Sequence, residues 1–359
     1  MASESRKTGP NVDQLLKQTC EWLRGTGPNS DIVMSSRVRL ARNIENLPFT
    51  HWCSKKQEKE SMELLHEAVL ASDLLKTGNF VRMAEIDDVD KQFLLERHLI
   101  SREHIVHPEF KAVVIGDKEV LSVMVNEEDH LRIQVMQSGF NLQECWRIAN
   151  RLDDLLHKRV PFAYHQEWGY LTACPTNAGT GLRASVMLHL PSLVMTKQIN
   201  RVLQAITKLG MTARGLYGEG TEAEGNFFQI SNQITMGSPE EDIIDNMERI
   251  IRQVIGHEEN SRKSLMKQNR EMLQDKIMRS NGTSRSAHII STKEMMGLLS
   301  MVRLGVDMGI ITDIDSRAVN ELFILTQPAH LQKIEGKILS SAQRDAKRAN
   351  LIRRRLEGR

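Results

Sequence analysis

A thiol, two glycines and an arginine lie close together in the segment Cys174-Pro-Thr-Asn-Ala-Gly-Thr-Gly-Leu-Arg-Ala-Ser185. Gly179 and Gly181 can adopt backbone angles that are closed to other residues, and they let a ligand approach the main chain. The planar guanidinium of Arg183 matches the geometry of phosphate oxygens. A thiol beside glycines and a fixed positive charge can become a reactive thiolate, so Cys174 is a candidate for chemistry. In isolation, the pattern is equally typical of a glycine turn next to an inert, buried cysteine.

The charge around this loop favours a polyanionic ligand. From Trp168 to Gly218 the sequence contains no Asp or Glu, although the whole chain is nearly balanced, with 48 basic and 46 acidic residues. A carboxylate-free stretch of that length is therefore a local feature, and it suits the phosphates of a nucleotide. The basic residues of this stretch are Arg183, Lys197, Arg201, Lys208 and Arg214.

Two familiar phosphate-binding motifs do not account for the loop. A P-loop ends in Gly-Lys-Ser/Thr, whereas this loop continues from Gly181 to Leu and Arg. The spacing Gly179-x-Gly181-x-x-Ala184 matches the dinucleotide fingerprint, which must open a helix and precede an acidic residue about 20 positions on. Here residues 185–190 form a short apolar run typical of a strand, and the next acidic residue is Glu219. A Rossmann site is therefore excluded.

Two further groups of charged residues suit a reaction involving phosphate. Arg37 and Arg39 are two positions apart, so they share one face of a strand and repel each other unless an anion bridges them. The turn 126–129 carries three carboxylates, those of Glu127, Glu128 and Asp129. Taken alone, the arginine pair is typical of a solvated strand face and the turn of a solvated acidic hairpin.

Together, these segments resemble the phosphagen (guanidino) kinases. Four motifs carry the resemblance: SSRVR at 35–39, NEEDHLR at 126–132, CPTNAGTGLRAS at 174–185 and RGLYGEGTEAEG at 214–225. They span residues 35 to 225, and the joint match is highly specific. Within this family, the chain is most similar to the bacterial kinases that phosphorylate arginine in proteins.

The resemblance implies an ATP-dependent protein-arginine kinase that transfers the γ-phosphoryl of ATP to arginine side chains, its own included. A guanidinium stays protonated at neutral pH, so catalysis needs carboxylates that orient it and accept a proton, and cations that hold the phosphoryl group. The implied catalytic residues are Glu128, Glu219 and Cys174, with Mg²⁺ bridging the ATP phosphates and no side chain as metal ligand. The implied ATP-binding residues are Ser35, Ser36, Arg37, Val38, Arg39, His98, Arg132, Arg183, Ala184, Ser185, Val186, Met187, Arg214, Gly215, Leu216, Tyr217 and Gly218.

The elements that position these residues are expected to form an α+β fold, in which a mainly antiparallel sheet flanked by helices precedes an all-helical domain. Apolar runs predict strands at 80–83, 111–115, 120–125, 130–136, 185–190 and 226–234. Helical spacing and capping patterns predict helices at 12–23, 58–75, 142–157 and 196–209, and helix starts at Ser238, Ser291 and Asp315, with Gly305 and Gly336 as breaks. The expected divisions are a tail with a short helix (1–25), a phosphagen-kinase-like catalytic domain (26–256) and a helical domain (257–359).

The chain departs from the phosphagen-kinase pattern at both ends. Kinases of free guanidines carry a sizeable helical domain before their SSRVR motif, but here only about one helix precedes Ser35, which favours an open site. The added helical domain contains Arg344-Asp345-x-x-Arg348-Ala349, whose charged residues share one helix face. In isolation this is typical of an exposed basic helix. Resemblance to the protein-arginine kinases implies an allosteric phosphoarginine-binding site formed by Arg344, Asp345, Arg348 and Ala349.

The remaining expectations concern location, partners and alternatives. Four cysteines without paired spacing, and no apolar run of membrane-spanning length, indicate a reducing cytoplasm and no membrane partner. The alternatives are a metabolic arginine kinase making free phosphoarginine, or a non-catalytic adaptor using the basic C-terminus, where nine Lys/Arg face four Asp/Glu after residue 319. The catalytic motifs disfavour the adaptor, so no direct nucleic-acid partner is expected. The resemblance implies a homodimer, protein substrates with exposed arginines, a zinc-finger activator, a heat-shock repressor and a Clp ATPase, in stress response and proteolysis.

Overall fold

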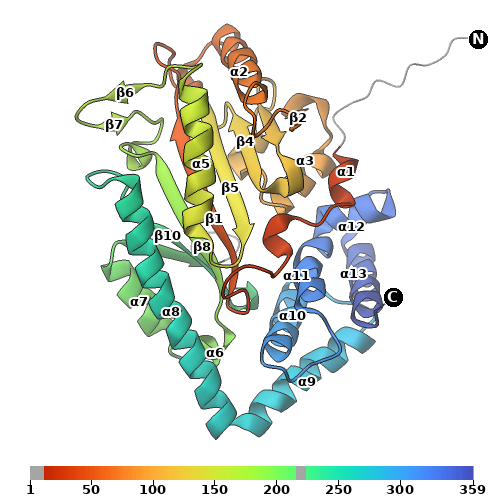
Figure 1. Ribbon diagram of the computed structural model, residues 1–359. Helices are drawn as coiled ribbons and strands as arrows, with labels where there is room; N and C mark the ends of the chain where they lie inside the picture. The colour runs from red at the N-terminus through yellow and green to blue at the C-terminus, as the bar shows by residue number, and fades with distance from the viewer. Residues whose placement is uncertain (1–11, 216–223, 359) are drawn as a thin grey trace, which may run out of the picture.

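An eight-stranded antiparallel sheet forms the centre of the computed structural model, which describes residues 12–215 and 224–358 (Figure 1). The strand order within the described residues is β2-β3-β4-β5-β1-β8-β10-β9. This confirms the predicted α+β fold and the antiparallel pairing of the strands between 111 and 136. The strands are β1 (Val33–Arg42), β2 (Asn79–Arg82), β3 (Ala112–Ile115), β4 (Leu121–Val125), β5 (Leu131–Ser138), β8 (Leu182–His189), β9 (Met211–Gly215) and β10 (Phe227–Asn232).

One face of the sheet is apolar and covered by helices. Alternate residues of the central strands, such as Val38, Ile133 and Val186, are fully buried in one core. That core also includes the apolar stripes of α5 (Leu142–His157), which lies in front of the strands in Figure 1, of α8 (Glu240–Gln268) and of α2 (Lys55–Leu70). Because side chains alternate along a strand, the intervening residues must point to the opposite face.

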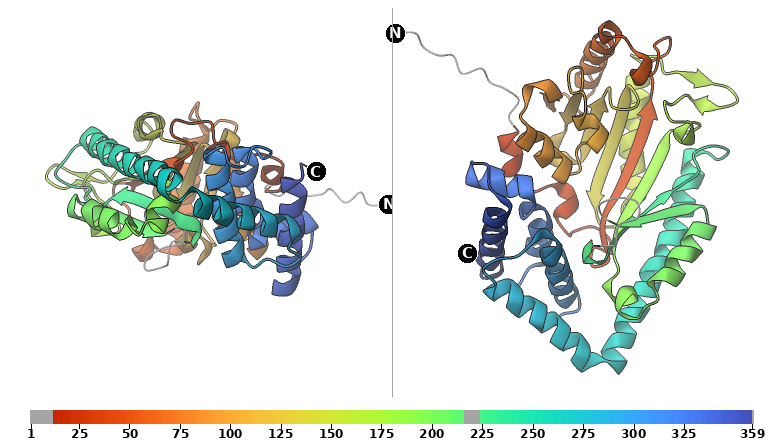
Figure 2. Two further views of the ribbon diagram at one scale, coloured as in Figure 1. Left: turned by 90° about the horizontal axis from the view of Figure 1, so that it is seen from below. Right: turned by 180° about the vertical axis from the view of Figure 1, so that it is seen from behind.

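The opposite face is the one left open for chemistry. Viewed from behind, strands β5, β1 and β8 cross the centre of the molecule without a helix in front of them (Figure 2, right). This face carries Arg37 and Arg39 on β1, as their spacing predicts, with Gln134 and Arg183 directly opposite Arg39 on the two neighbouring strands.

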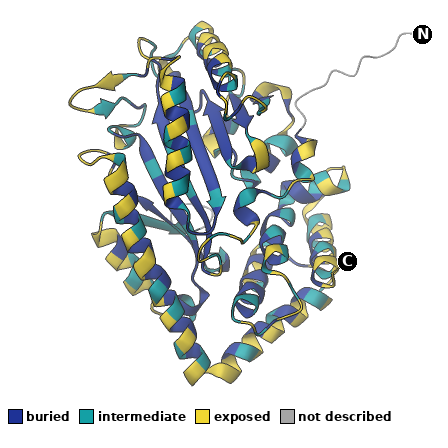
Figure 3. Cartoon of the chain, in the orientation of Figure 1, coloured by how far each residue is buried: buried dark blue, intermediate teal, exposed yellow. Residues whose placement is uncertain are grey.

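The helical region packs against one end of the open face. A second core combines residues of α10 and α11 with Trp22, Met34, Met136 and Phe227 from the sheet side. Met295, Met296 and Met301 are buried within it, so these methionines are core residues. Figure 3 shows this burial beside the exposed outer surfaces of the helices. The helices are α9 (Arg270–Ser286), α10 (Thr292–Asp307), α11 (Ser316–Leu325), α12 (Pro328–Glu335) and α13 (Ser341–Leu356).

Several element boundaries differ from the sequence expectations. The expected division at residue 256 falls inside α8, which continues to Gln268 before the chain turns at Asn269. The helix expected at 12–23 is a short α1 (Asp13–Leu16) followed by a 3-10 turn, Glu21–Leu23. The helix expected at 196–209 is α7 (Ile199–Lys208), and it is preceded by a short helix that was not expected, α6 (Pro191–Met195).

The helix start predicted at 238–241 is confirmed by α8, but its serine cap and the break predicted at Gly305 are wrong. Among the described residues no side chain caps α8, because Pro239 rather than Ser238 occupies the N-cap position. Gly305 does not end a helix: it lies within α10, where an added Cβ would come within 2.5 Å of Ile277, so its role is close helix packing. The caps at Ser291 and Asp315 form as predicted, and Gly336 ends α12 in the left-handed conformation.

Candidate active site

The open face of the sheet concentrates positive charge. Arg39 on β1 lies directly opposite Arg183 on β8, and Arg37 precedes Arg39 on the same face. Arg37 donates hydrogen bonds to the hydroxyl of Ser185 (3.2 Å) and to the side-chain oxygen of Gln229 (3.0 Å). Arg214 on β9 pairs with Gln229 across the next strand, which extends the basic face toward the sheet edge. This arrangement suits a ligand with several negative charges.

The arginines oppose one another electrostatically. Burial and the charge of Arg183 lower the pKa of Arg37 to about 10, so Arg37 remains protonated at neutral pH. Burial, together with Arg37, Arg132 and Arg183, also lowers the pKa of Arg39 well below its ordinary value. The Nε atom of Arg39 is buried and has no hydrogen-bond partner within the described residues. A bound anion would relieve both the repulsion and the missing hydrogen bond.

The carboxylates of the β4–β5 turn surround one arginine. The Arg132 guanidinium contacts Glu127 (2.7 Å), Glu128 (3.1 Å) and Asp129 (3.1 Å). Although burial raises it, the pKa of Glu127 is lowered overall because Arg132 and a hydrogen bond from Ser101 favour the carboxylate. Arg132, predicted to bind ATP phosphates, is therefore engaged with acidic side chains in this structure. Glu128 is the carboxylate that reaches solvent, with 43% of its side chain exposed.

Asp129 connects the carboxylate turn with the cysteine loop. Its side chain is fully buried, and its Oδ1 atom accepts hydrogen bonds from the amide of Asn43 (2.8 Å) and the backbone N–H of Ala173 (2.8 Å). Its Oδ2 atom accepts from Arg132. The sequence alone assigns Asp129 no role, because a position in an acidic turn does not distinguish it from exposed neighbours. The structure makes it the link that fixes Glu128 relative to Cys174.

The loop that follows Cys174 is held in one conformation by backbone contacts. Gly179 and Gly181 have φ angles of 101° and 63°, which confirms the expectation that these positions need glycine. A Cβ at Gly179 would lie 2.4 Å from the carbonyl oxygen of Thr235. The Thr235 hydroxyl shares its single proton between the carbonyls of Thr176 (3.0 Å) and Ala178 (2.7 Å).

Residues of the sheet, of the carboxylate turn and of the Cys174 loop line a common cavity of about 530 Å³. Glu128 and Cys174 contribute an acceptor and a thiol, and Arg39 and Arg183 contribute the cations of the sheet. The Cys174 sulfur lies 3.0 Å from the Thr176 hydroxyl. A proton acceptor beside a phosphate-binding surface is the arrangement that phosphoryl transfer to a nitrogen requires. Four residues expected at this site, Leu216, Tyr217, Gly218 and Glu219, lie outside the described residues.

A second, apolar cavity lies further along the same face. His98 and Arg37 line it together with Phe323 and Ile324 of α11. Burial and the charge of Arg37 lower the pKa of His98 to about 4, so its ring is neutral at physiological pH. Ser35, Ser185 and Met187, also expected at the ATP site, line this cavity too.

Other residues of the expected ATP set do not point toward either cavity. The side chains of Val38, Ala184 and Val186 belong to the apolar core on the opposite face. The Ser36 hydroxyl is buried and donates to the carbonyl of Gly139 (2.8 Å). Gly215 is the last residue of β9 and is paired with Phe228. The alternation of a β-strand accounts for these positions, because a contiguous motif on a strand presents only every second side chain to one face.

The Arg344-Asp345-x-x-Arg348-Ala349 motif is partly internal. Arg348 is 1% exposed and donates to the carbonyls of Thr326 (2.9 Å) and Ile290 (2.8 Å), and it also contacts Asp345. Ala349 is buried in the helical core. Arg344 and Asp345 are half-buried, and Arg344 donates to the carbonyl of Leu339 (2.8 Å). Arg348 therefore joins α13 to the end of α11, while the other two charged residues remain accessible.

Comparisons with known proteins agree with this fold. The family model for the C-terminal catalytic domain of ATP:guanido phosphotransferases matches residues 60–261. The crystal structure of a lombricine kinase matches with a TM-score of 0.58 at 22% identity, over 69% of this chain and 75% of that chain. The substrate-free duplicated taurocyamine kinase from Schistosoma mansoni matches with a TM-score of 0.58 at 23% identity, over 79% and 44% of the two chains. The family model covers more than half of the chain and shows that it belongs to the ATP:guanido phosphotransferases.

Longer matches identify the branch of this class. The model described as the C-terminal domain of the protein-arginine kinase McsB matches residues 270–359. The protein-arginine kinase of Halothermothrix orenii is 46% identical over 96% of this chain and 98% of its own length. That of Desulforamulus reducens is 49% identical over 94% and 95%. The chain belongs to the protein-arginine kinase family.

Proposed function

We propose that this chain transfers the γ-phosphoryl group of ATP to arginine side chains of proteins. The observation that carries the proposal is the shared cavity, in which Glu128 and Cys174 face the paired arginines Arg39 and Arg183. Family membership supports the kinase activity and the use of ATP. The geometry supports separate roles, in which acidic residues hold the arginine that accepts the phosphoryl group and basic residues hold the nucleotide.

The reaction follows from the chemistry of the guanidinium group. As a bond forms between a guanidinium nitrogen and the γ-phosphorus, the nitrogen loses a proton and ADP leaves with the electrons of the broken P–O bond. Glu128 is the residue proposed to accept that proton, because it combines a carboxylate with access to the cavity. Cys174 would help hold the cationic acceptor in place. Glu219 is proposed as the second orienting carboxylate and lies outside the described residues.

The nucleotide is proposed to lie along the open face. Arg39 and Arg183 would contact the transferring phosphoryl group, and Arg37 and Arg214 the remaining phosphates, with the apolar cavity beside His98 at the far end. The described residues contain no group of three or more His, Cys, Asp or Glu side chains that could hold a metal. Mg²⁺ is proposed to arrive on the ATP phosphates, whose charge it would reduce.

We also propose that phosphoarginine regulates the kinase through Arg344 and Asp345. An arginine can bind a phosphate and a carboxylate can bind the attached guanidinium. Arg348 lies beside Asp345 and bonds the carbonyl of Thr326, which follows α11. Phe323 and Ile324 of that helix line the cavity that contains Arg37 and His98. Binding at α13 could therefore bias the nucleotide end of the active site, with reciprocal coupling between the two ligands.

Location and partners are proposed from the described surface and from the family. No described helix is long and apolar enough to cross a membrane. The four cysteines, all within the described residues, are free thiols, which suits the proposed cytoplasmic location. Exposed Ile289 and Ile338 on the helical region suit the proposed homodimer. A zinc-finger activator, a heat-shock repressor and a Clp ATPase remain the proposed partners in stress response and proteolysis.

The proposed activity is tested by incubating the chain with ATP and a mixture of unfolded proteins. The products are analysed by mass spectrometry under non-acidic conditions, because the N–P bond is acid-labile. A parallel reaction contains free arginine as the only acceptor. Phosphorylated arginines within proteins support the proposal. Phosphorylation of free arginine alone would indicate the metabolic alternative, and no transfer to either acceptor would support the non-catalytic one.

A further inference from the structure

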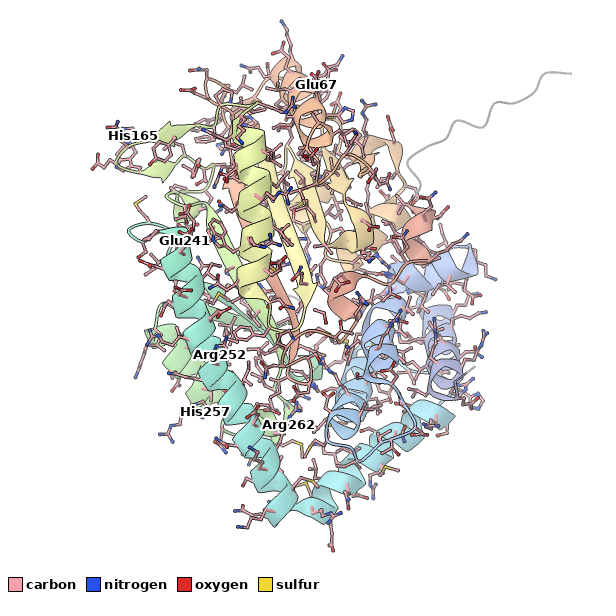
Figure 4. All side chains as sticks on the ribbon, in the orientation of Figure 1. Glu67, His165, Glu241, Arg252, His257 and Arg262 are labelled. Atoms are coloured by element: carbon pink, nitrogen blue, oxygen red, sulfur yellow. The ribbon has the colours of Figure 1, made fainter. Side chains whose placement is uncertain are left out.

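A third cavity lies on the other side of the Cys174 loop. It has a volume of about 250 Å³ and lies between the β6–β7 hairpin (β6, Tyr164–His165; β7, Gly169–Tyr170) and the start of α8. Figure 4 labels His165 on the projecting hairpin and Glu241 at the neighbouring end of α8. The volume is below the roughly 300–1,000 Å³ of ordinary small-molecule sites, so the cavity fits a single side chain rather than a cofactor.

The lining of this cavity is acidic and aromatic. Glu167 and Glu240 provide its charged groups, and none of its described lining residues is Lys, Arg or His. The rings of Tyr164, Trp168 and Tyr170 also line it, and the first two side chains are more than half exposed, at 59% and 53%. Carboxylates beside aromatic faces attract organic cations through ion pairing and cation–π contacts.

One of these rings already contacts a cation. The Arg42 guanidinium lies 3.5 Å from the centre of the Tyr170 ring. Arg42 is 1% exposed, and its charge is compensated by Asp153, whose carboxylate accepts two hydrogen bonds from it (2.7 and 3.1 Å). Arg42 therefore packs against the Tyr170 ring of the hairpin. Because its charge is compensated by Asp153, the cavity remains open to an external cation.

The cavity shares a wall with the active site. Gly179 and Thr180 line it, while Cys174, Thr176 and neighbouring residues of the same loop line the 530 Å³ cavity. The hairpin is fixed to this loop, because the N–H groups of Tyr170 and Gly179 donate to each other's carbonyls (2.7 and 3.2 Å). A polypeptide with an arginine in the active site must pass close to the loop, so residues next to that arginine come within reach of the third cavity.

We propose that this cavity binds a cationic side chain of the protein substrate, a lysine or arginine near the arginine that is phosphorylated. The inference rests on the proposed function and adds a substrate preference to it. Glu167 and Glu240 would pair with the cation, and Trp168 would contact its aliphatic stem. The acidic first turn of α8 also complements the helix dipole. The interaction with the helix dipole involves Glu241 equally, although Glu241 does not line the cavity. The helix dipole also does not explain the exposed aromatic rings.

Synthetic peptides with a single arginine provide the test. In one series a lysine occupies each position within five residues of the arginine, and in the matched series norleucine replaces it, so that only the charge differs. Lysine is not an acceptor and cannot compete for phosphorylation. For the unmodified chain, we expect kcat/KM to rise roughly fivefold for lysine over norleucine at one or two positions. The double substitution Glu167→Gln with Glu240→Gln should abolish that preference and leave the norleucine peptides unaffected.

The substitution Glu241→Gln is the matched control, because it removes the same charge from the same helix end outside the cavity. It should retain the lysine preference, whereas Trp168→Leu should reduce it. Transfer to the peptides without any lysine preference, or a preference that survives the double substitution, would overturn this inference and leave the proposed function intact. Failure of the unmodified chain to phosphorylate any peptide or protein arginine would overturn both.

Discussion

Arg39 and Arg183 are direct cross-strand neighbours on β1 and β8, so two guanidinium groups face each other on the floor of the proposed active site. Like charges in this position destabilise a sheet. Burial and the adjacent arginines lower the pKa of Arg39, so its charged form is destabilised at this position. A fold selected only for stability would place an apolar or acidic side chain at one of the two positions. A bound anion that both arginines contact would remove this conflict, which supports the proposed nucleotide site.

Replacing Arg39 should separate stability from nucleotide binding. Arg39→Met removes a buried charge and keeps an unbranched side chain, so we expect the free energy of unfolding to rise by about 1 kcal/mol without nucleotide. ATP affinity should fall at least roughly tenfold, because a charge-assisted phosphate contact is lost. Urea unfolding and calorimetry with ATP measure the two effects. Arg147→Met, on the exposed surface of α5, is the control. Unchanged ATP affinity would contradict the assignment of Arg39.

Asp129 should matter for turnover rather than for nucleotide binding. Asp129→Asn retains one acceptor oxygen but brings an amide N–H₂ against a site where Asn43, Ala173 and Arg132 all donate. We expect a loss of about 1–3 kcal/mol in stability and a kcat reduced by roughly a hundredfold, because Glu128 and Cys174 lose their common anchor. Asp154→Asn, on the surface of α5, should change neither. A kcat near the original value would show that this link is not required.

Substitutions in the Arg344–Ala349 motif of α13 should have different effects on stability and on phosphoarginine binding. Arg348→Ala leaves the carbonyls of Thr326 and Ile290 without their donors, so we expect it to destabilise the helical region by about 3 kcal/mol. The double substitution Arg344→Ala with Asp345→Ala should retain the fold and abolish any response to free phosphoarginine. Calorimetry with phosphoarginine and with phosphoserine measures that response. Equal binding of both compounds by the unmodified chain would refute selective phosphoarginine recognition.

Stability should decrease as the pH falls from 7 to 5. Burial lowers the pKa of His98, His104 and His130 to about 4 each, below the value of roughly 6.5 expected for unfolded histidine. Between these values the unfolded chain binds more protons, so protonation favours unfolding. Burial raises the pKa of Asp307 to about 6 and also raises that of Glu58, and both groups oppose the trend. Thermal unfolding at both pH values tests the balance, and an equal or higher Tm at pH 5 would contradict it.

The sequence predicted the parts of the fold that depend on local pattern. Residues 142–157 form a helix with the expected bounds, because their apolar positions follow helical spacing without interruption. Arg37 and Arg39 share a face because strand geometry requires it. Gly305 was misinterpreted because its neighbour Ile277 belongs to another helix, and a contact between helices has no signature in the local sequence.

The contacts among the expected site residues could not be predicted from the sequence. The motif around Val38 and Val186 suggested a continuous ATP-binding segment, whereas the sheet sends these side chains into the core. The pairing of Arg132 with acidic residues, and the role of Asp129, depend on a turn that meets the Cys174 loop in space. Burial of Arg348 likewise depends on α11 and on the loop before α10. Each of these facts is set by tertiary packing.

Glu128→Gln tests the central claim most directly. Glutamine keeps the size of the side chain and an oxygen that can accept from Arg132, but it cannot take the proton from the acceptor nitrogen. Phosphoarginine formation on a protein substrate is measured together with ATP affinity. We expect transfer to fall roughly a thousandfold while ATP affinity stays close to that of the unmodified chain, because the phosphates contact the arginines of the sheet. Near-normal transfer by the variant would contradict the assignment of this cavity as the site of arginine phosphorylation.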